Sequence, residues 1–141
     1  MAKTRIGANA IFSGPQKGLS IIGDRCYAYS GAVAASDSLQ TLLDFNTGKG
    51  FIVATLTMTA TIRMVSGELG SGYLRGWQLD FNGQTVGLYK ADSASSGDNL
   101  PTVETEILIP PLTNVVLTCV DSAATVNWKG TANITGRIYD A

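Results

Sequence analysis

The most regular pattern in the chain is an alternation of apolar and polar residues between positions 51 and 65. From Ile52 to Met64 every even position is apolar, and from Thr55 to Arg63 every odd position is a threonine or an arginine. A period of two places these two sets on opposite faces of a β-strand. The pattern therefore predicts one long strand with a core face and a threonine-rich face that meets solvent or a partner.

A second long strand is predicted over 124–139, near the end of the chain. Its polar positions alternate with an apolar row that Gly130 and Gly136 interrupt as gaps or bulges. The apolar residues of this row are Val126, Trp128, Ala132, Ile134 and Ile138. We expect 51–65 and 124–139 to be the two longest strands of the fold.

The clearest turn signal is Asn82-Gly83, which lies between two segments of alternating residues. Asn-Gly supplies the two positive-φ positions that a two-residue type I′ turn requires. The pairs expected from this closure are Phe81 with Gln84, Leu79 with Val86, and Trp77 with Leu88. In this register the apolar residues of both strands share one face.

Shorter strands are predicted at 19–22, 25–30, 103–109 and 115–120, separated by turn residues. The segment 39–43 is ambiguous, because Ser36 or Asp37 could cap a short helix there. A strand over 41–45 is preferred, since the residues that follow it at 46–50 are typical of a hairpin loop.

These segments predict a single all-β domain of about eight or nine strands. The preferred architecture is a two-sheet β-sandwich of jelly-roll or Greek-key type, and a closed barrel is the alternative. The chain shows no composition shift that would mark a second domain. The β-sandwich domain is assigned to 19–141, and 1–18 is assigned to an extended N-terminal arm.

The arm is basic, although the whole chain has a net charge of only −1. It carries Lys3, Arg5 and Lys17, and no acidic residue precedes Asp24. It is broken by glycine and proline and lacks the periodicity needed to fold alone. It is either a loose terminus or an arm that becomes ordered on a neighbouring subunit, and in the second case its order is expected to come from that partner. The low net charge and the absence of a long apolar run predict neither a nucleic-acid partner nor a membrane partner.

The composition offers little for catalysis, because the chain contains no histidine. Cys26 and Cys119 are expected to be reduced core residues. Glu104 and Glu106 share a strand face and are interpreted as solvated. Asp92 and Asp98 in the loop 92–99 could bind calcium, but they lack the spacing of an EF-hand. We therefore expect a protein that is not an enzyme and that needs no metal or cofactor.

The aromatic residues leave one alternative class open, a carbohydrate-binding β-sandwich. Trp77 and Trp128 fall on the expected core faces of their strands, so packing is the preferred role for both. A sugar-binding module needs exposed rings, and Tyr73 and Tyr89 near strand ends are the candidates for that role.

Three segments of the chain carry a resemblance to a known group of proteins. They are Y-A-Y-S-G at 27–31, L-L-D-F-x-T-G-x-G-F-I at 42–52, and W-x-G followed by I-T-G-R-I-Y-D at 128–140. With these segments the chain resembles small β-sandwich capsid decoration (cement) proteins of tailed bacteriophages, in particular those of marine podovirus type. The resemblance implies a non-enzymatic virion protein, often trimeric, that is made in the host cytoplasm and seated on the major capsid protein at the capsid surface.

If that resemblance holds, the basic arm and the threonine face of the long strand are the expected contacts with the capsid and with other copies of the chain. Small molecules are not expected as partners. The residues expected to bind a partner are Lys3, Arg5, Phe12, Lys17, Thr55, Thr57 and Thr59.

Overall fold

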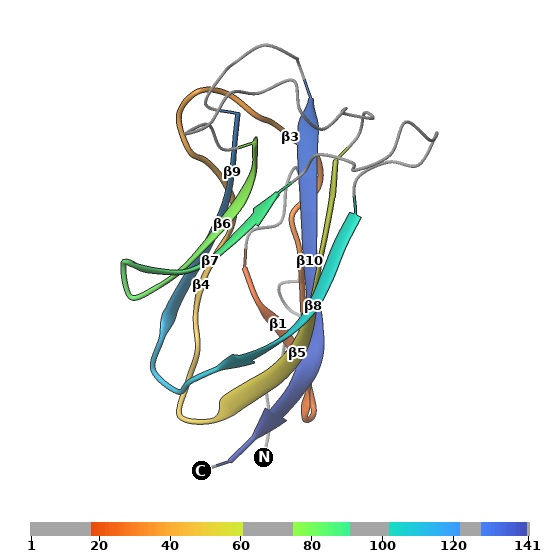
Figure 1. The fold of residues 1–141 in the computed structure, drawn as a ribbon. Helices are drawn as coiled ribbons and strands as arrows, with labels where there is room; N and C mark the ends of the chain where they lie inside the picture. The colour runs from red at the N-terminus through yellow and green to blue at the C-terminus, as the bar shows by residue number, and fades with distance from the viewer. Residues whose placement is uncertain (1–17, 61–74, 91–101, 122–127, 141) are drawn as a thin grey trace.

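The computed structural model describes residues 18–60, 75–90, 102–121 and 128–140, and every regular element among them is a β-strand. The strands form two antiparallel sheets that face each other (Figure 1), which confirms the predicted all-β sandwich. The first sheet consists of β1 (Ser20–Ile22), β2 (Arg25–Tyr29), β10 (Lys129–Tyr139), β5 (Phe51–Ala60) and β8 (Thr102–Ile109) in that order, with β3 (Val33–Ala34) paired to β10. The second sheet consists of β4 (Gln40–Asn46), β9 (Asn114–Asp121), β6 (Arg75–Phe81) and β7 (Gln84–Lys90).

The strand pairs of the two sheets are nested along the chain. The innermost pair is β6 with β7, and around it come β5 with β8, β4 with β9, and β2 with β10. A long hairpin that is wrapped into two sheets produces this order of pairs. We interpret the topology as a jelly roll, which has eight main strands in two sheets.

The two longest described strands are β10 with 11 residues and β5 with 10 residues, and they pair with each other. Their ladder runs from Gly130 opposite Ala60 to Tyr139 opposite Phe51. The predicted continuations at 61–65 and 122–127 lie outside the described residues, as does the arm over 1–17. Within the described part, the alternation of buried and more exposed residues along β5 follows the sequence prediction at every position.

The core lies between the sheets and is built from aliphatic and aromatic side chains. Leu56, Met58 and Ile134 from the first sheet, and Leu117 from the second, have no exposed surface. Trp77 and Trp128 are also buried, and their rings meet edge to face with centroids 5.7 Å apart. Both tryptophans therefore pack in the core, as expected.

The β6–β7 hairpin has the predicted turn but not the predicted register. Asn82 and Gly83 have φ angles of 52° and 80°, which confirms the positive-φ turn. The observed pairs are Phe81 with Gln84, Asp80 with Thr85, Leu79 with Gly87, Gln78 with Leu88, and Trp77 with Tyr89. A register shift next to Leu79 sends Tyr89 to the core side. The expected pairings of Leu79 with Val86 and of Trp77 with Leu88 are therefore wrong, while that of Phe81 with Gln84 is confirmed.

The segment around Leu42 is a strand and not a helix, which settles the ambiguity in the sequence. It belongs to β4, and its register with β9 shifts between Thr41 and Leu43. Leu42 and Leu43 are both fully buried, although adjacent residues of a regular strand point to opposite faces. The bulge allows both to face inward. No helix capable of crossing a membrane occurs among the described residues.

An ion pair buried at one end of the sandwich was not apparent from the sequence. Arg75 Nε lies 3.4 Å from Asp121 Oδ2, and both side chains are 1% exposed. The indole Nε1 of Trp128 donates a hydrogen bond to the same carboxylate oxygen at 3.2 Å. This cluster joins β6 and β9 to the start of β10, and removing one charge of such a pair costs about 3–5 kcal/mol.

Candidate functional site

The candidate site is the outer face of the first sheet, meaning the side chains of β2, β10, β5 and β8 that point away from the second sheet. The antiparallel registers align these side chains in rows across the strands. One row contains Glu106, Thr55, Thr135 and Tyr27. On one side of it lies the row of Glu104, Thr57, Asn133 and Tyr29, and beyond that the row of Thr102, Thr59 and Thr131. On the other side of the Thr55 row lies the row of Leu108, Val53, Arg137 and Arg25.

Thr55, Thr57 and Thr59 lie on β5, between β10 and β8, and are half-buried. The hydroxyl of Thr57 donates a long hydrogen bond of 3.5 Å to Glu104 Oε2. The hydroxyl of Thr131 on β10 donates one of 3.3 Å to the carbonyl of Thr59. The face predicted from the sequence therefore exists, whereas the other four predicted contacts, Lys3, Arg5, Phe12 and Lys17, lie outside the described residues.

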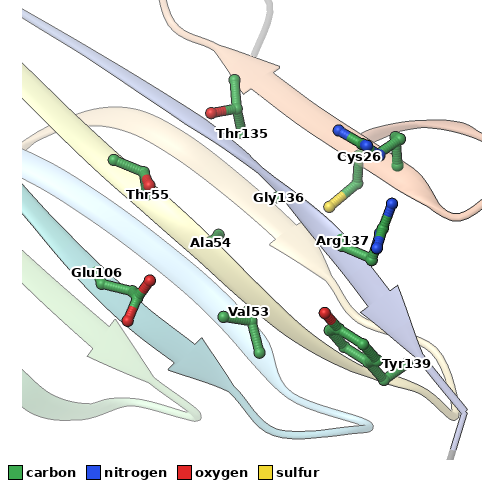
Figure 2. A pocket seen from close by; sticks show the side chains of 10 residues that line it. Cys26, Val53, Ala54, Thr55, Glu106, Thr135, Gly136, Arg137 and Tyr139 are labelled. Carbon is green, nitrogen blue, oxygen red and sulfur yellow. The ribbon is translucent and has the colours of Figure 1, made fainter.

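A hollow of about 460 Å³ occupies one end of the outer face (Figure 2). Its lining includes Thr55, Thr135 and Glu106, which Figure 2 shows side by side on three neighbouring strands. The other lining residues are Arg25, Cys26, Val53, Ala54, Gly136, Arg137 and Tyr139. Thr57 and Thr59 are not part of the lining, so the hollow includes only one of the three predicted threonines.

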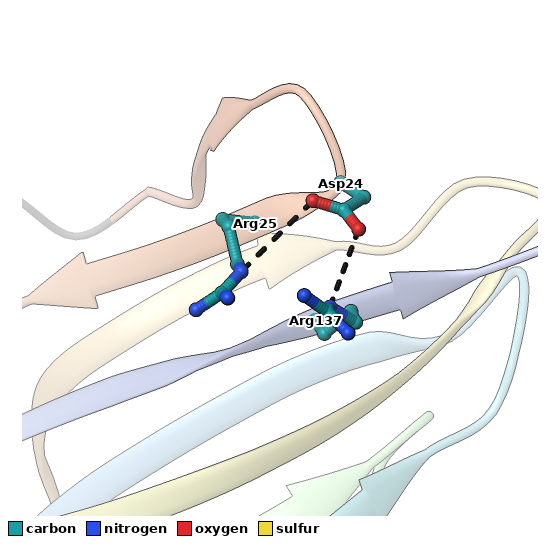
Figure 3. Close-up of polar contacts among 3 residues, drawn as sticks. All are labelled: Asp24, Arg25 and Arg137. Carbon is teal, nitrogen blue, oxygen red and sulfur yellow. Dashed lines mark ion pairs between the residues drawn. The ribbon is translucent and has the colours of Figure 1, made fainter.

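One carboxylate holds the two arginines of the hollow together (Figure 3). Asp24 Oδ2 lies 3.2 Å from Arg137 Nε, and Asp24 Oδ1 lies 3.9 Å from Arg25 Nε. Asp24 follows Gly23, which has a φ of 62° in the β1–β2 turn. The backbone amide of Ile138 donates to the Asp24 carbonyl at 2.8 Å and ties this turn to β10. All three charged side chains are exposed, so the ion pairs orient the guanidinium groups and add little stability.

Tyrosine rings lie on the same face. Tyr27 and Tyr29 have ring centroids 5.2 Å apart, and Tyr29 is 50% exposed. Tyr139 is 41% exposed and stacks on Phe51 at 5.3 Å. Tyr29 and Tyr139 are thus exposed rings. Tyr29 is one of the aromatic residues considered from the sequence for a sugar platform, with Tyr27, Tyr89 and the two tryptophans, whereas Tyr139 is not.

The two tyrosines named for that role do not supply an exposed ring in the described part of the chain. Tyr89 is half-buried and packs against the core, and burial raises the pKa of its phenol. Tyr73 lies outside the described residues. The register shift in β6–β7 explains the position of Tyr89, because it turns that side chain toward Trp77.

Groups with catalytic or metal-binding potential do not gather in the described part of the chain. Glu104 and Glu106 are exposed on one face of β8, as predicted. Cys26 and Cys119 are free and buried, and burial raises the pKa of both thiols from 9.0 to about 11. Such thiols are poor nucleophiles near neutral pH. The candidate calcium loop at 92–99 lies outside the described residues, and the described ones contain no group of three metal-ligating side chains.

The hollow was not predicted because its residues come from four strands that are far apart in sequence. Arg25 is on β2, Glu106 on β8, and Arg137 and Tyr139 on β10. The only local signal was the Gly23-Asp24 turn, which places a carboxylate directly before a strand. Pairing this turn with residue 137 requires the long-range register of β2 with β10.

Comparisons with known proteins give no family for this chain. No protein family model matches it, and no curated protein matches it. Among solved structures, it is similar to a chain in the crystal structure of the infectious bursal disease virus VP2 subviral particle, with 16% sequence identity and a TM-score of 0.35. The similarity covers 80% of this chain and 30% of that chain. A similarity of this size carries no argument about function, so the site is interpreted from its own residues.

Proposed function

We propose that this chain is a non-enzymatic structural protein of a virion, a decoration protein that binds the major capsid protein of a tailed phage and stabilises the head. It would act as a homo-oligomer, with a trimer as the unit. Its contacts with the capsid would be formed by the arm over 1–18 and by the part of the outer face that contains Thr57 and Thr59.

The observation that carries this proposal is the position of two of the three segments that resemble decoration proteins, 27–31 and 128–140. Segment 27–31 begins in β2, segment 42–52 runs from β4 into β5, and segment 128–140 contains β10. The strands β2, β10 and β5 are direct neighbours in one sheet. Segments 27–31 and 128–140 therefore lie side by side on β2 and β10, and segment 42–52 reaches the same sheet at Phe51 and Ile52, while its first half lies in β4 of the other sheet. The contact between the first two segments supports a shared binding face on this sheet.

The chemistry of this surface supports a protein partner. On β5, β10 and β2 its central rows consist of threonine, asparagine and tyrosine side chains, most of them only half-buried, and Glu104 and Glu106 complete the rows on β8. Hydroxyl and amide groups suit a hydrated interface, where bridging water completes many contacts. Tyrosine adds apolar area with a polar end, which favours interface positions.

The arm supports a multivalent mode of binding. Lys3, Arg5 and Lys17 offer positive charge to an acidic neighbour, and Phe12 offers an apolar anchor. Each contact would be weak, but symmetry repeats it around an oligomer and over the capsid. Linked weak contacts of this kind give a high combined affinity.

A sedimentation assay with undecorated, expanded capsids of the phage that encodes this chain tests the proposal. The intact chain is expected to co-sediment with the capsids and to raise their rupture temperature. Deletion of residues 2–17 is expected to reduce binding sharply. Replacement of Lys3, Arg5 and Lys17 by serine is expected to reduce it less, and mainly at low salt, because salt screens exposed charges.

The contribution of the sheet face is tested by Thr57→Lys, with Gln84→Lys as the matched control. Thr57 faces Glu104, so the new lysine has a nearby carboxylate and the fold is expected to persist. Gln84 is exposed on β7 of the other sheet. Weakened capsid binding by Thr57→Lys alone supports the assigned face. If the truncated protein and Thr57→Lys both bind capsids at full strength, neither assigned contact is correct. If the intact chain does not co-sediment with the capsids, the proposed function itself is wrong.

A further inference from the structure

The hollow on the outer face has the size of a small-molecule site and polar groups that the protein itself leaves unused. Its volume of about 460 Å³ falls within the range of about 300–1,000 Å³ that is common for ligand sites. Within the described part of the chain, the hydroxyls of Thr55 and Thr135 and the carboxylate of Glu106 form no hydrogen bond or ion pair. In the adjacent row, by contrast, Thr57 and Glu104 bond to each other. The row that lines the hollow is thus the one with free donors and acceptors.

The charges around the hollow are balanced, and this excludes several classes of ligand. Arg25 and Arg137 carry two positive charges, while Asp24 and Glu106 carry two negative ones. Glu106 lies across the hollow from the arginines, at a strand spacing of roughly 10 Å from β10. A polyanion would meet the carboxylate of Glu106, and a polycation would meet the guanidinium groups. A ligand without net charge that both donates and accepts hydrogen bonds satisfies all of these groups.

Aromatic rings border the hollow on two sides. Tyr139 belongs to its lining, and its ring is held by stacking on Phe51. Tyr27 lies directly beside Thr135 in the row that crosses the sheet, and its ring contacts that of Tyr29. Rings of this kind offer an apolar surface for the C–H face of a sugar, and their hydroxyls remain available for polar contacts.

We propose that this hollow is a binding site for a neutral oligosaccharide. The carboxylate of Glu106 would accept hydrogen bonds from two sugar hydroxyls, and the guanidinium of Arg137 would donate to others. Thr55 and Thr135 can do both, and Tyr139 packs against one pyranose ring. Further sugar units could lie along the outer face of the sheet from Thr135 toward Tyr27. This activity goes beyond the proposed binding to a capsid, which uses the arm and the Thr57 and Thr59 rows.

The test is an NMR titration of the intact, ¹⁵N-labelled chain with defined oligosaccharides. The neutral probes are maltotriose, cellotriose and the trimer of N-acetylglucosamine. The charged probes are a heparin tetrasaccharide and the trimer of glucosamine. At least one neutral probe is expected to shift the backbone amides around Thr55, Thr135 and Tyr139 in a saturable manner. The proposal is overturned if none of the neutral probes gives saturable shifts at these amides, or if a charged probe binds more strongly there.

Two pairs of variants place the sugar in the hollow. Glu106→Gln removes one charged acceptor and is expected to weaken binding about tenfold. Glu104→Gln changes the same residue type two positions away on the same face, outside the hollow, and is expected to leave binding unchanged. Tyr139→Phe should retain binding because the ring remains, whereas Tyr139→Ala should lose most of it.

These variants also separate this proposal from capsid binding. Glu106 and Tyr139 lie outside the rows of Thr57 and Thr59, so both proposals can fail independently. Equal effects of Glu104→Gln and Glu106→Gln on sugar affinity would contradict the assigned location. Shifts at the hollow with capsid protein but with none of the neutral sugars would identify it as part of a protein interface instead.

Discussion

The paired strands β5 and β10 follow the sequence pattern closely, whereas the hairpin of β6 and β7 departs from it. In β5 each apolar residue from Ile52 to Ala60 at an even position is buried. In β7 the apolar residues Val86 and Leu88 are 53% and 60% exposed, although alternation places them with the core. The difference shows that an alternating pattern is reliable only where neighbouring strands fix its register.

The two regions differ in the number of neighbours that each strand has. β5 pairs with β10 on one side and with β8 on the other, so a shift would break two ladders. β7 is an edge strand with β6 as its one partner in the described sheet. An edge strand can take up a bulge at a lower cost, and bulges are common at sheet edges.

Packing around Gly87 favours the shifted register of β7. A Cβ atom at this position would lie 2.6 Å from the hydroxyl oxygen of Tyr89. The tyrosine ring therefore fills the space that a side chain at 87 would need. In this register the half-buried tyrosine ring packs against the core, whereas Leu88 is exposed.

The largest effect is expected from a substitution that disrupts the regular pair of β5 and β10. Leu56 is fully buried on the core face of β5, so Leu56→Asp is expected to prevent folding, because an unpaired buried charge costs several kcal/mol. Thr57→Asp on the outer face is expected to leave the domain folded, with a loss of about 1 kcal/mol or less from its position opposite Glu104. Circular dichroism and urea denaturation measure both. Similar losses for the two variants would show that both faces of β5 are buried.

A smaller effect is expected from Gly136, where β10 passes between β2 and β5. An added Cβ would lie 2.5 Å from the Val53 carbonyl oxygen and 2.6 Å from the Ala54 Cβ. Gly136→Ala is therefore expected to lower the free energy of unfolding by about 1–3 kcal/mol, because backbone atoms have to move. The control is Gly48→Ala, where no atom lies within 4 Å. An unchanged urea midpoint for Gly136→Ala would contradict the close pairing of these strands.

The turn of the irregular hairpin provides the third prediction. Gly83 has a φ of 80°, which a β-branched side chain strongly disfavours. Gly83→Val is expected to lower the free energy of unfolding by about 1–2 kcal/mol, as measured by thermal unfolding. A neutral result would mean that the turn can change its length.

The smallest effect tests the register of β7 itself. Leu88→Thr is expected to change the free energy of unfolding by no more than about 0.5 kcal/mol, because Leu88 is exposed. Leu79→Ala on the partner strand is expected to cost about 2–5 kcal/mol, since Leu79 is 2% exposed. If Leu88→Thr destabilises the protein as strongly as Leu79→Ala, the regular register is correct and the bulge is not.

Part of the candidate site could be predicted from the sequence. The alternation in β5 is enough to place Thr55, Thr57 and Thr59 on one face. The hollow beside them could not be predicted, because Glu106 and Arg137 reach Thr55 only through two separate ladders. Which polar side chains lie side by side depends on register, and register is a long-range property.

The sequence by itself determined which residues face inward along the long strands, where the tight turn at Asn82-Gly83 lies, and that the fold is all-β. These features depend on the period of the side chains and on φ preferences, which are local. Only the tertiary structure decided the bulges in β4 and β7, the buried pair of Arg75 with Asp121, and the grouping of charges around the hollow. Each of these results from packing two sheets together, where the space available at one strand is set by residues that are distant in the chain.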